Sequence, residues 1–140
     1  MKNKTLIYIT GPTGIGKTKI SIALAKKIHS EIISSDSRQF YKEMTIGTSV
    51  PSMIDLKTVT HHFIHHLRVI EDYTIGDYEK DCIKLINEKF KIHDLLIMTG
   101  GSGMYADSVL YGLDKLPKTN IKIRKSLNSL FKKRGLEYLQ

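Results

Sequence analysis

A glycine-rich segment near the amino end has the residue types and spacing of a phosphate-binding loop. It matches the pattern G-x-x-x-x-G-K-[ST] in the residues Gly11, Pro12, Thr13, Gly14, Ile15, Gly16, Lys17 and Thr18. Glycines let the backbone curl so that its N–H groups point at phosphate oxygens, and a following helix adds its positive amino end. Lys17 would supply a mobile positive charge, and the Thr18 hydroxyl would be placed to bind Mg²⁺. The segment therefore predicts a phosphate site with Thr18 as a metal ligand.

The pattern says less about which phosphate compound the loop holds. A hydrolysing NTPase usually ends a later apolar strand in an aspartate that holds the magnesium ion. Here the apolar run at residues 95–99 ends in Thr99 and continues into Gly100, while Asp94 stands before the run. This departure weakens a motor-like or GTPase-like interpretation. It leaves transferases that act on a bound phosphate or diphosphate ester, and small-molecule or nucleotide kinases that use the same loop for ATP.

A carboxylate, Asp36, follows the second apolar run of the chain. In open α/β sheets, ligands bind along the carboxyl edge, where the phosphate loop also opens. Asp36 could remove a proton from an incoming nucleophile, could bind magnesium, or could simply cap a turn. The next residues, Ser37, Arg38 and Gln39, can hydrogen-bond a base edge or a phosphate.

Three short apolar runs, at residues 6–10, 31–35 and 95–99, predict strands that are buried on both faces. Helical segments alternate with them, and parallel neighbouring strands need such crossovers, so the sequence predicts an α/β fold with a parallel sheet. A three-stranded parallel sheet is at the small end of what occurs. We therefore expect the chain to be part of a larger protein.

Four helices are predicted from apolar residues at helical spacing. The first covers residues 17–29, and its apolar face is made of Ile20, Ala23, Leu24 and Ile28. The second covers residues 76–90 behind the start signal Thr74 and Asp77, with an apolar face of Tyr78, Cys82, Leu85 and Ile86. A short helix ends near Gly112, and a last amphipathic helix carries Ile123, Leu127, Leu130 and Phe131.

The composition excludes several classes of protein. The 140 residues, 41% of them hydrophobic and 26% charged, are typical of one ordinary globular domain, so residues 1–140 are treated as one catalytic core. The single cysteine, Cys82, excludes an internal disulfide and a cysteine-based zinc site. No apolar run approaches the ~20 residues that span a bilayer, and the start lacks a secretory signal. We expect a cytoplasmic, monomeric protein without a membrane segment.

The net charge of +8 is concentrated in residues 115–134, a predicted basic helical segment. This segment has no acidic residue and contains Lys115, Lys118, Lys122, Arg124, Lys125, Lys132, Lys133 and Arg134. The rest of the chain is nearly neutral. Such asymmetry predicts a polyanionic partner, and a solvated helix face is the alternative.

Five motifs in this order resemble the tRNA dimethylallyltransferase (tRNA isopentenyltransferase) family. They are GPTGIGKT, EIISSDSRQFYKEMTIGT, HHFIHH, DYTIGDYEKD and TGGSGMY. The resemblance runs from Leu6 to about Leu127. It implies a P-loop NTPase-like three-layer core and the transfer of a dimethylallyl group to the exocyclic N6 amine of the adenine just 3′ of the anticodon. The family chain is about twice as long, so the resemblance covers its N-terminal portion.

The resemblance also implies a role for individual residues. The phosphate loop would bind dimethylallyl diphosphate, with Mg²⁺ shared between Thr18 and the diphosphate, and Lys17 would neutralise the departing diphosphate. Asp36 aligns with the general base, and residues 36–39 align with the segment that holds the extruded adenine. Ser102 aligns with a family threonine at a tRNA-contacting turn, and Arg124 falls at a second tRNA-contacting position. The implied partner is the anticodon arm of tRNA; an inactive remnant that only binds phosphate or RNA is a further alternative.

Two other features are interpreted as packing, and a third is left open. The four histidines His61, His62, His65 and His66 invite a metal interpretation, but the apolar residues between them favour packing. Cys82 lies on an apolar helix face and is expected in the core. Tyr105 could line a substrate channel or pack.

Overall fold

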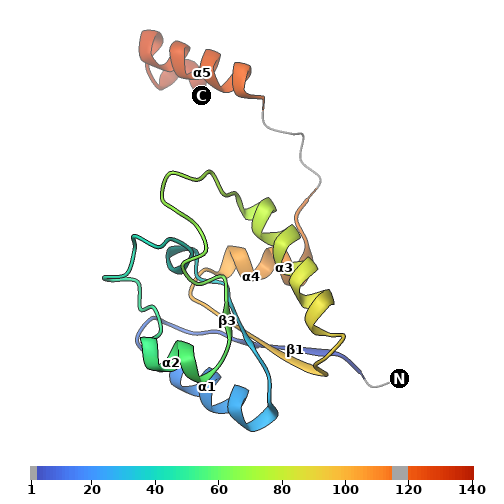
Figure 1. The fold of residues 1–140 in the computed structure, drawn as a ribbon. Coiled ribbons are helices and arrows are strands. Elements are labelled where there is room, and N and C mark those ends of the chain that lie inside the picture. Colours follow the sequence, from blue (N-terminus) through green and yellow to red (C-terminus); the bar gives the residue numbers. More distant parts are fainter. Residues whose placement is uncertain (1–2, 115–119) are drawn as a thin grey trace.

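A four-stranded parallel sheet forms the centre of the computed structural model, which describes residues 3–114 and 120–140. Its strands stand in the order β1-β4-β2-β3 (Figure 1). Their bounds are β1 Thr5–Ile9, β2 Ile32–Ser34, β3 His61–His62 and β4 Leu95–Thr99. The predicted α/β fold with a parallel sheet is therefore confirmed.

The three predicted strands are present, and a fourth was missed. β3 has only two residues, both histidines, which pair with Ile32 and Ile33 of β2. The two residues of β3 are not apolar, so the sequence does not indicate a strand there. β3 belongs to the sheet because it pairs with β2. The expectation that all three apolar runs are buried on both faces holds for β2 and β4 but is wrong for β1. In the described part of the chain β1 pairs with β4 alone, and its residues remain partly exposed.

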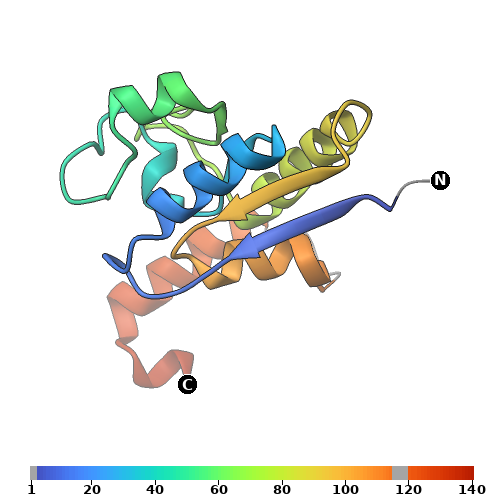
Figure 2. The same ribbon diagram turned by 90° about the horizontal axis from the view of Figure 1, so that it is seen from below.

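Helices cover both faces of the sheet, as the three-layer prediction requires. In Figure 2, α1 and α4 lie on opposite sides of the strands. The helix bounds are α1 Lys17–Ile28, α2 Met53–Thr58, α3 Ile75–Lys89, α4 Gly103–Tyr111 and α5 Ile121–Arg134, with 3₁₀ turns η1 Ser37–Phe40 and η2 Glu137–Leu139. In the described residues, none of the helices is long and apolar enough to cross a membrane.

Two apolar clusters hold the layers together. Alternate residues of a strand point to opposite faces, so the sheet contributes to both. On one face Ile33, Leu96 and Met98 pack against α3 and α4 in a cluster that also contains Phe40 and Ala106. On the other face, Ile32 and Ile97 pack with Ile22, Ala25 and Val59.

The predicted helix at residues 17–29 is confirmed, but its predicted buried face is partly wrong. The structure buries Ser21, Ile22 and Ala25, while Ile20 is 59% exposed. Leu24 and Ile28 only flank the cluster. The helix begins directly after the phosphate loop, so the loop, and not the apolar pattern alone, sets which side of the helix meets the sheet.

Helix α3 begins where its start signal predicts. Thr74 caps it, and the Thr74 and Asp77 side chains each accept the other residue's backbone N–H in a capping box. Tyr78 and Cys82 of the predicted face are fully buried. Cys82 is a core residue, as predicted, and this burial raises the pKa of its thiol to about 12.

Tyr78 links α3 to the functional edge of the sheet through one buried hydrogen bond. Its hydroxyl donates to the Ser34 carbonyl oxygen at 3.0 Å. Changing Tyr78→Phe leaves that carbonyl without this donor, so we expect the free energy of unfolding to fall by about 1–2 kcal/mol. Urea denaturation measures the loss. The control Tyr111→Phe removes a hydroxyl from a side chain that is 84% exposed and should change nothing; equal stability of both variants would contradict the prediction.

The predicted last helix is present as α5, but its apolar residues are not buried. Ile123 is 58% exposed and Phe131 is 47% exposed, and no residue of this helix is buried in the described chain. Figure 1 shows α5 apart from the sheet and its covering helices. Of the predicted basic segment, Lys115 and Lys118 lie outside the described residues.

Candidate functional site

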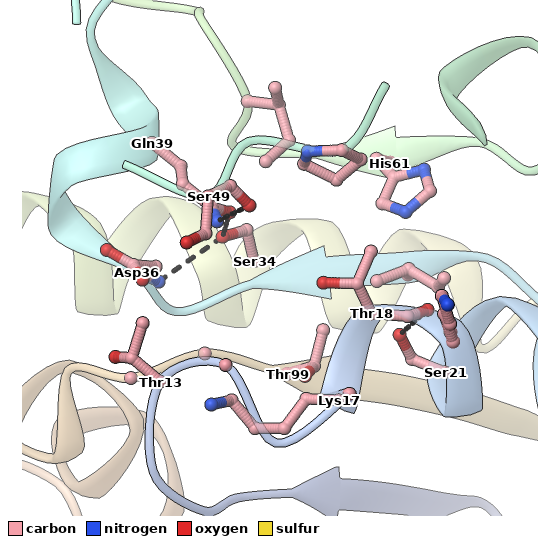
Figure 3. Close-up of a pocket in the computed structure, with 18 residues that line it drawn as sticks. Thr13, Lys17, Thr18, Ser21, Ser34, Asp36, Gln39, Ser49, His61 and Thr99 are labelled. Atoms are coloured by element: carbon pink, nitrogen blue, oxygen red, sulfur yellow. Dashed lines mark hydrogen bonds between the residues drawn. The ribbon is translucent and has the colours of Figure 1, made fainter. Parts of the chain in front are cut away.

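A cavity of about 230 Å³ opens at the carboxyl edge of the sheet. The phosphate loop, the ends of β2 and β4, the segment before α2, and β3 with the residues after it form its walls. In Figure 3 the side chains of Thr13, Lys17 and Asp36 lie around one end of the cavity, and His61 lies toward the other. The sequence predicted this edge as the ligand site, and the structure brings the phosphate loop and Asp36 together there.

The phosphate loop adopts a curled backbone that its glycines make possible. Gly14 and Gly16 have φ angles of 85° and 97°, in the left-handed region that favours glycine. Helix α1 starts at the next residue, so its unpaired N–H groups face the loop. The Lys17 ammonium group folds back over the loop and donates to the carbonyl oxygens of Gly11 at 2.7 Å and Pro12 at 2.8 Å. The loop therefore combines N–H donors and a cation, as an anionic phosphate compound requires.

Thr18 lines the cavity beside Lys17, and its helix turn is held by Ser21. The Ser21 hydroxyl donates to the Thr18 carbonyl oxygen at 3.0 Å. At the end of β4, the Thr99 hydroxyl donates to the Ile9 carbonyl oxygen at 3.2 Å. Thr99 thus joins two strands in the position where a hydrolysing NTPase would carry an aspartate. With Thr18 and Asp36 the cavity offers oxygen ligands of the kind that Mg²⁺ prefers.

Asp36 both caps a turn and lines the cavity, so its capping role is compatible with a chemical role in the cavity. Its Oδ1 accepts the backbone N–H of Arg38 at 3.1 Å, at the start of η1. Its Oδ2 lies on the other side, 3.5 Å from the position that a Cβ on Gly101 would take, and Thr13 Oγ1 lies 3.9 Å from that position. One carboxylate oxygen therefore holds the backbone while the other faces the phosphate loop.

The structure brings Ser37 and Ser102 together from positions 65 residues apart. The Ser102 hydroxyl accepts the Ser37 N–H at 3.2 Å, and the two hydroxyl groups are also 3.2 Å apart. These contacts orient the Ser102 side chain. The glycine-rich turn after β4 is thereby joined to the polar segment after β2.

Arg38, Gln39 and Arg124 occupy three different environments. The Arg38 side chain is exposed, whereas Gln39 points inward and lines the cavity. Arg124 lies on the exposed helix α5, which Figure 1 shows away from the sheet edge. The structure thus groups residues 36–39 with Ser102 and does not bring Arg124 to them.

Gly100 allows the ends of β2 and β4 to approach each other. A Cβ on Gly100 would lie 2.4 Å from Ser35 Oγ, 2.5 Å from the Ser35 carbonyl carbon and 2.8 Å from the Asp36 nitrogen. We expect Gly100→Ala to lower the free energy of unfolding by about 1–3 kcal/mol, because the Ser35 and Asp36 backbone must move. The matched control is Gly103→Ala, where the new Cβ meets nothing within 4 Å. Thermal denaturation of both variants measures the difference, and equal melting temperatures would contradict this account.

Sequence reasoning missed several residues of the cavity wall. Ser49, Pro51, His61 and Ile64 all line it. His61 Nδ1 lies 2.8 Å from the Val59 carbonyl oxygen, while Nε2 is buried and, within the described chain, has no hydrogen-bond partner. Burial lowers the pKa of the His61 imidazole. His61 and Ile64 stand in the HHFIHH motif, but the motif does not say which of its side chains meet the cavity, because that depends on the pairing of β3 with β2.

The four histidines do not form a metal site. His62 Nε2 lies 2.5 Å from Glu31 Oε2, and the His66 ring packs edge-on against Phe40 at 5.2 Å. Burial alone would raise the pKa of Glu31, but hydrogen bonds with Lys89 and His62 hold it below its usual value. Among the described residues, no group of three or more possible metal-binding side chains occurs. Of the four histidines, His66 packs in the aromatic cluster, while His62 pairs with Glu31.

Tyr105 packs and does not line the cavity. Its ring lies 5.5 Å from the Phe40 ring and 5.3 Å from the Tyr78 ring, both edge-on or tilted. The same aromatic cluster contains Phe63 and Tyr73. Phe40, which directly follows Gln39, anchors the polar segment after β2 in this cluster.

Known proteins match the chain over almost all of its length. A family model described as IPP transferase matches residues 39–140. The tRNA dimethylallyltransferase of Flavobacterium johnsoniae is 51% identical over 98% of this chain, and tRNA dimethylallyltransferase 1 of Bacteroides thetaiotaomicron is 38% identical over 96%. Each match covers 44% of the relative. The chain therefore spans somewhat less than half the length of these relatives.

Two solved structures also match nearly all of this chain and less than half of their own. The tRNA isopentenylpyrophosphate transferase of Bacillus halodurans matches 98% of this chain and 46% of its own, with a TM-score of 0.77 and 31% identity. A eukaryotic dimethylallyltransferase described as acting on tRNA matches 93% of this chain and 35% of its own, with a TM-score of 0.75 and 27% identity. Together with the phosphate loop and the residues gathered around it, these matches show that the chain belongs to the IPP transferase family.

Proposed function

We propose that this chain is the part of a tRNA prenyltransferase that binds the diphosphate and supplies the general base. The reaction moves a dimethylallyl group from dimethylallyl diphosphate to the N6 amine of the adenine 3′ of the anticodon. The observation that carries the proposal is the meeting of Lys17, Thr13 and Asp36 at one end of a single cavity. The names of the relatives support the choice of substrates.

In this reaction the phosphate loop holds the diphosphate of the donor. Negative charge grows on the diphosphate as its oxygen leaves the allylic carbon, and a fixed cation stabilises that charge. The Lys17 ammonium group and the N–H groups at the start of α1 serve this role. The Thr18 hydroxyl would hold Mg²⁺ together with the diphosphate, and the bound ion would neutralise part of the diphosphate charge.

Asp36 is the proton acceptor of the proposed reaction. The adenine N6 attacks the allylic carbon, the carbon–oxygen bond to the diphosphate breaks, and one N6 proton passes to the carboxylate. The Oδ2 atom that faces the phosphate loop receives this proton, since Oδ1 is held by the Arg38 N–H. Reaching the cavity requires the adenine to leave the base stack, as in other enzymes that modify a base.

The basic helix α5 and the exposed Arg38 supply the proposed contacts to tRNA phosphates. Ser102 supplies a separate proposed RNA contact at the turn after β4, next to Ser37. Each cationic side chain that binds an RNA phosphate releases counterions, so the affinity for RNA falls as the salt concentration rises. In a plot of log affinity against log salt concentration, each phosphate contact adds about 0.7 to the steepness of this fall for single-stranded RNA. We expect Arg124→Ala to reduce the slope of tRNA affinity by about 0.7–0.9. Lys91→Ala, an exposed lysine at the opposite edge of the sheet, is the control and should not alter the slope. If both variants gave the same slope, Arg124 would not contact a tRNA phosphate, and the basic face of α5 would be a solvated helix face.

A kinase would need ATP in the same loop, and one titration separates the two ligand classes. Isothermal calorimetry with Mg²⁺ compares dimethylallyl diphosphate, inorganic diphosphate and ATP on the same protein. The proposal predicts that dimethylallyl diphosphate binds more tightly than ATP by at least about tenfold, a difference of roughly 1.4 kcal/mol. Tighter binding of ATP would favour the kinase and contradict the proposal.

A further inference from the structure

The Gln39 side chain forms hydrogen bonds with other residues of the protein. Its Oε1 accepts the Ser34 hydroxyl at 2.9 Å. Its Nε2 donates to the Ser49 carbonyl oxygen at 3.0 Å and to the Thr48 carbonyl oxygen at 3.3 Å. A glutamine amide has two N–H donors, so both are engaged. The sequence favoured Gln39 as a reader of a base edge or a phosphate, a role for which its N–H groups are already occupied.

The Ser34 hydroxyl extends this network to the proposed base. It accepts the Asp36 backbone N–H at 3.2 Å, and Ser34 is only 2% exposed. A continuous path of hydrogen bonds therefore runs from the Asp36 backbone through Ser34 and Gln39 to residues 48–49 (Figure 3).

The far end of the path is a tight turn that forms part of the cavity wall. The Thr48 hydroxyl donates to the Met44 carbonyl oxygen at 2.6 Å, which closes the turn on itself, and Ser49 lines the cavity. Gln39 joins this turn to the end of β2. The amide thus holds two walls of the cavity in one arrangement, and one of these walls carries Asp36.

We infer that Gln39 is a positioning residue that fixes Asp36 and the turn at residues 44–49, and that it does not read the RNA. Its catalytic consequence rests on the function proposed above for Asp36. Positioning a reacting group within a fraction of an ångström contributes strongly to rate, so loss of the amide should slow the transfer step.

The first test is a double-mutant cycle built from Gln39→Met, Ser34→Ala and the double variant. Methionine has a similar length but cannot form these hydrogen bonds. If Gln39 acts through Ser34, each single change lowers kcat by about tenfold, and the double variant is no slower than the slower single one. The affinity for tRNA should stay within about twofold of the starting protein in all three. Additive losses in kcat, or a tRNA affinity weakened tenfold by Gln39→Met alone, would overturn the inference.

The second test does not depend on activity. Hydrogen exchange of the peptide that covers residues 42–50 should become faster in Gln39→Met, while exchange in α3 stays unchanged. Arg38→Ala is the matched control, because its exposed side chain should leave this exchange unaltered. Unchanged exchange in Gln39→Met would overturn the inference. If exchange becomes faster but the starting protein transfers no dimethylallyl group, the link between Gln39 and the turn is supported while the proposed function fails.

Discussion

Changing Asp36→Asn is expected to lower the rate of dimethylallyl transfer by about 10²–10⁴-fold, the usual contribution of a general base. Asparagine keeps the shape of the side chain but cannot take the N6 proton. Its remaining carbonyl oxygen can still accept the Arg38 N–H, which Asp36 Oδ1 accepts at 3.1 Å, so the cap on η1 should survive. The measurement is a single-turnover assay with saturating tRNA and dimethylallyl diphosphate.

The affinity for dimethylallyl diphosphate separates this loss from a folding defect. Since Lys17 and the phosphate loop are untouched, the dissociation constant in Asp36→Asn should remain within about threefold of the starting protein. Normal turnover by this variant would show that Asp36 is not the base. A loss of diphosphate affinity equal to the loss in rate would instead assign Asp36 to donor binding.

Changing Lys17→Ala is expected to weaken binding of the diphosphate and to slow transfer by a further 10²–10³-fold or so, because the cation meets charge that grows in the transition state. The ammonium group donates hydrogen bonds to the Gly11 and Pro12 carbonyl oxygens at 2.7 and 2.8 Å, so it lies at the phosphate loop where the diphosphate would bind. Calorimetry with dimethylallyl diphosphate measures the first effect, and single-turnover kinetics the second.

Lys27→Ala is the matched control for this variant. It removes the same charge from an exposed position in the last turn of the same helix. Diphosphate affinity should be nearly unchanged there. If both lysine variants bind the donor as the starting protein does, the loop does not hold the diphosphate.

The features that could be predicted from the sequence are those decided by neighbouring residues. The phosphate loop needs only its glycines, Lys17 and Thr18 in order, and the start of α3 needs only Thr74 and Asp77 three residues apart. The strands β2 and β4 are apolar enough to be recognised from composition alone. Because the carboxyl ends of parallel strands meet at one edge of a sheet, the sequence also predicts that Asp36 lies beside the phosphate loop.

The features that could not be predicted depend on distant partners. β3 is a strand because β2 lies next to it, and its two histidines show no strand pattern. The apolar residues of α5 correctly predicted a helix. Their spacing does not show whether another part of the protein buries them, and in the described residues none is buried. Gln39 shows the same limit at the site, because its residue type suits a base contact while its partners, the carbonyl groups of Thr48 and Ser49, come from a turn that folds back upon it.

Analysis of the reaction product shows whether this protein transfers a dimethylallyl group to tRNA. The protein is incubated with unmodified tRNA, dimethylallyl diphosphate and Mg²⁺, and the digested nucleosides are analysed by mass. We expect isopentenyladenosine from the starting protein and at least about a hundredfold less from Asp36→Asn in the same early time window, at matched occupancy by the donor. Unmodified adenosine throughout, from folded protein that binds both substrates, would contradict it.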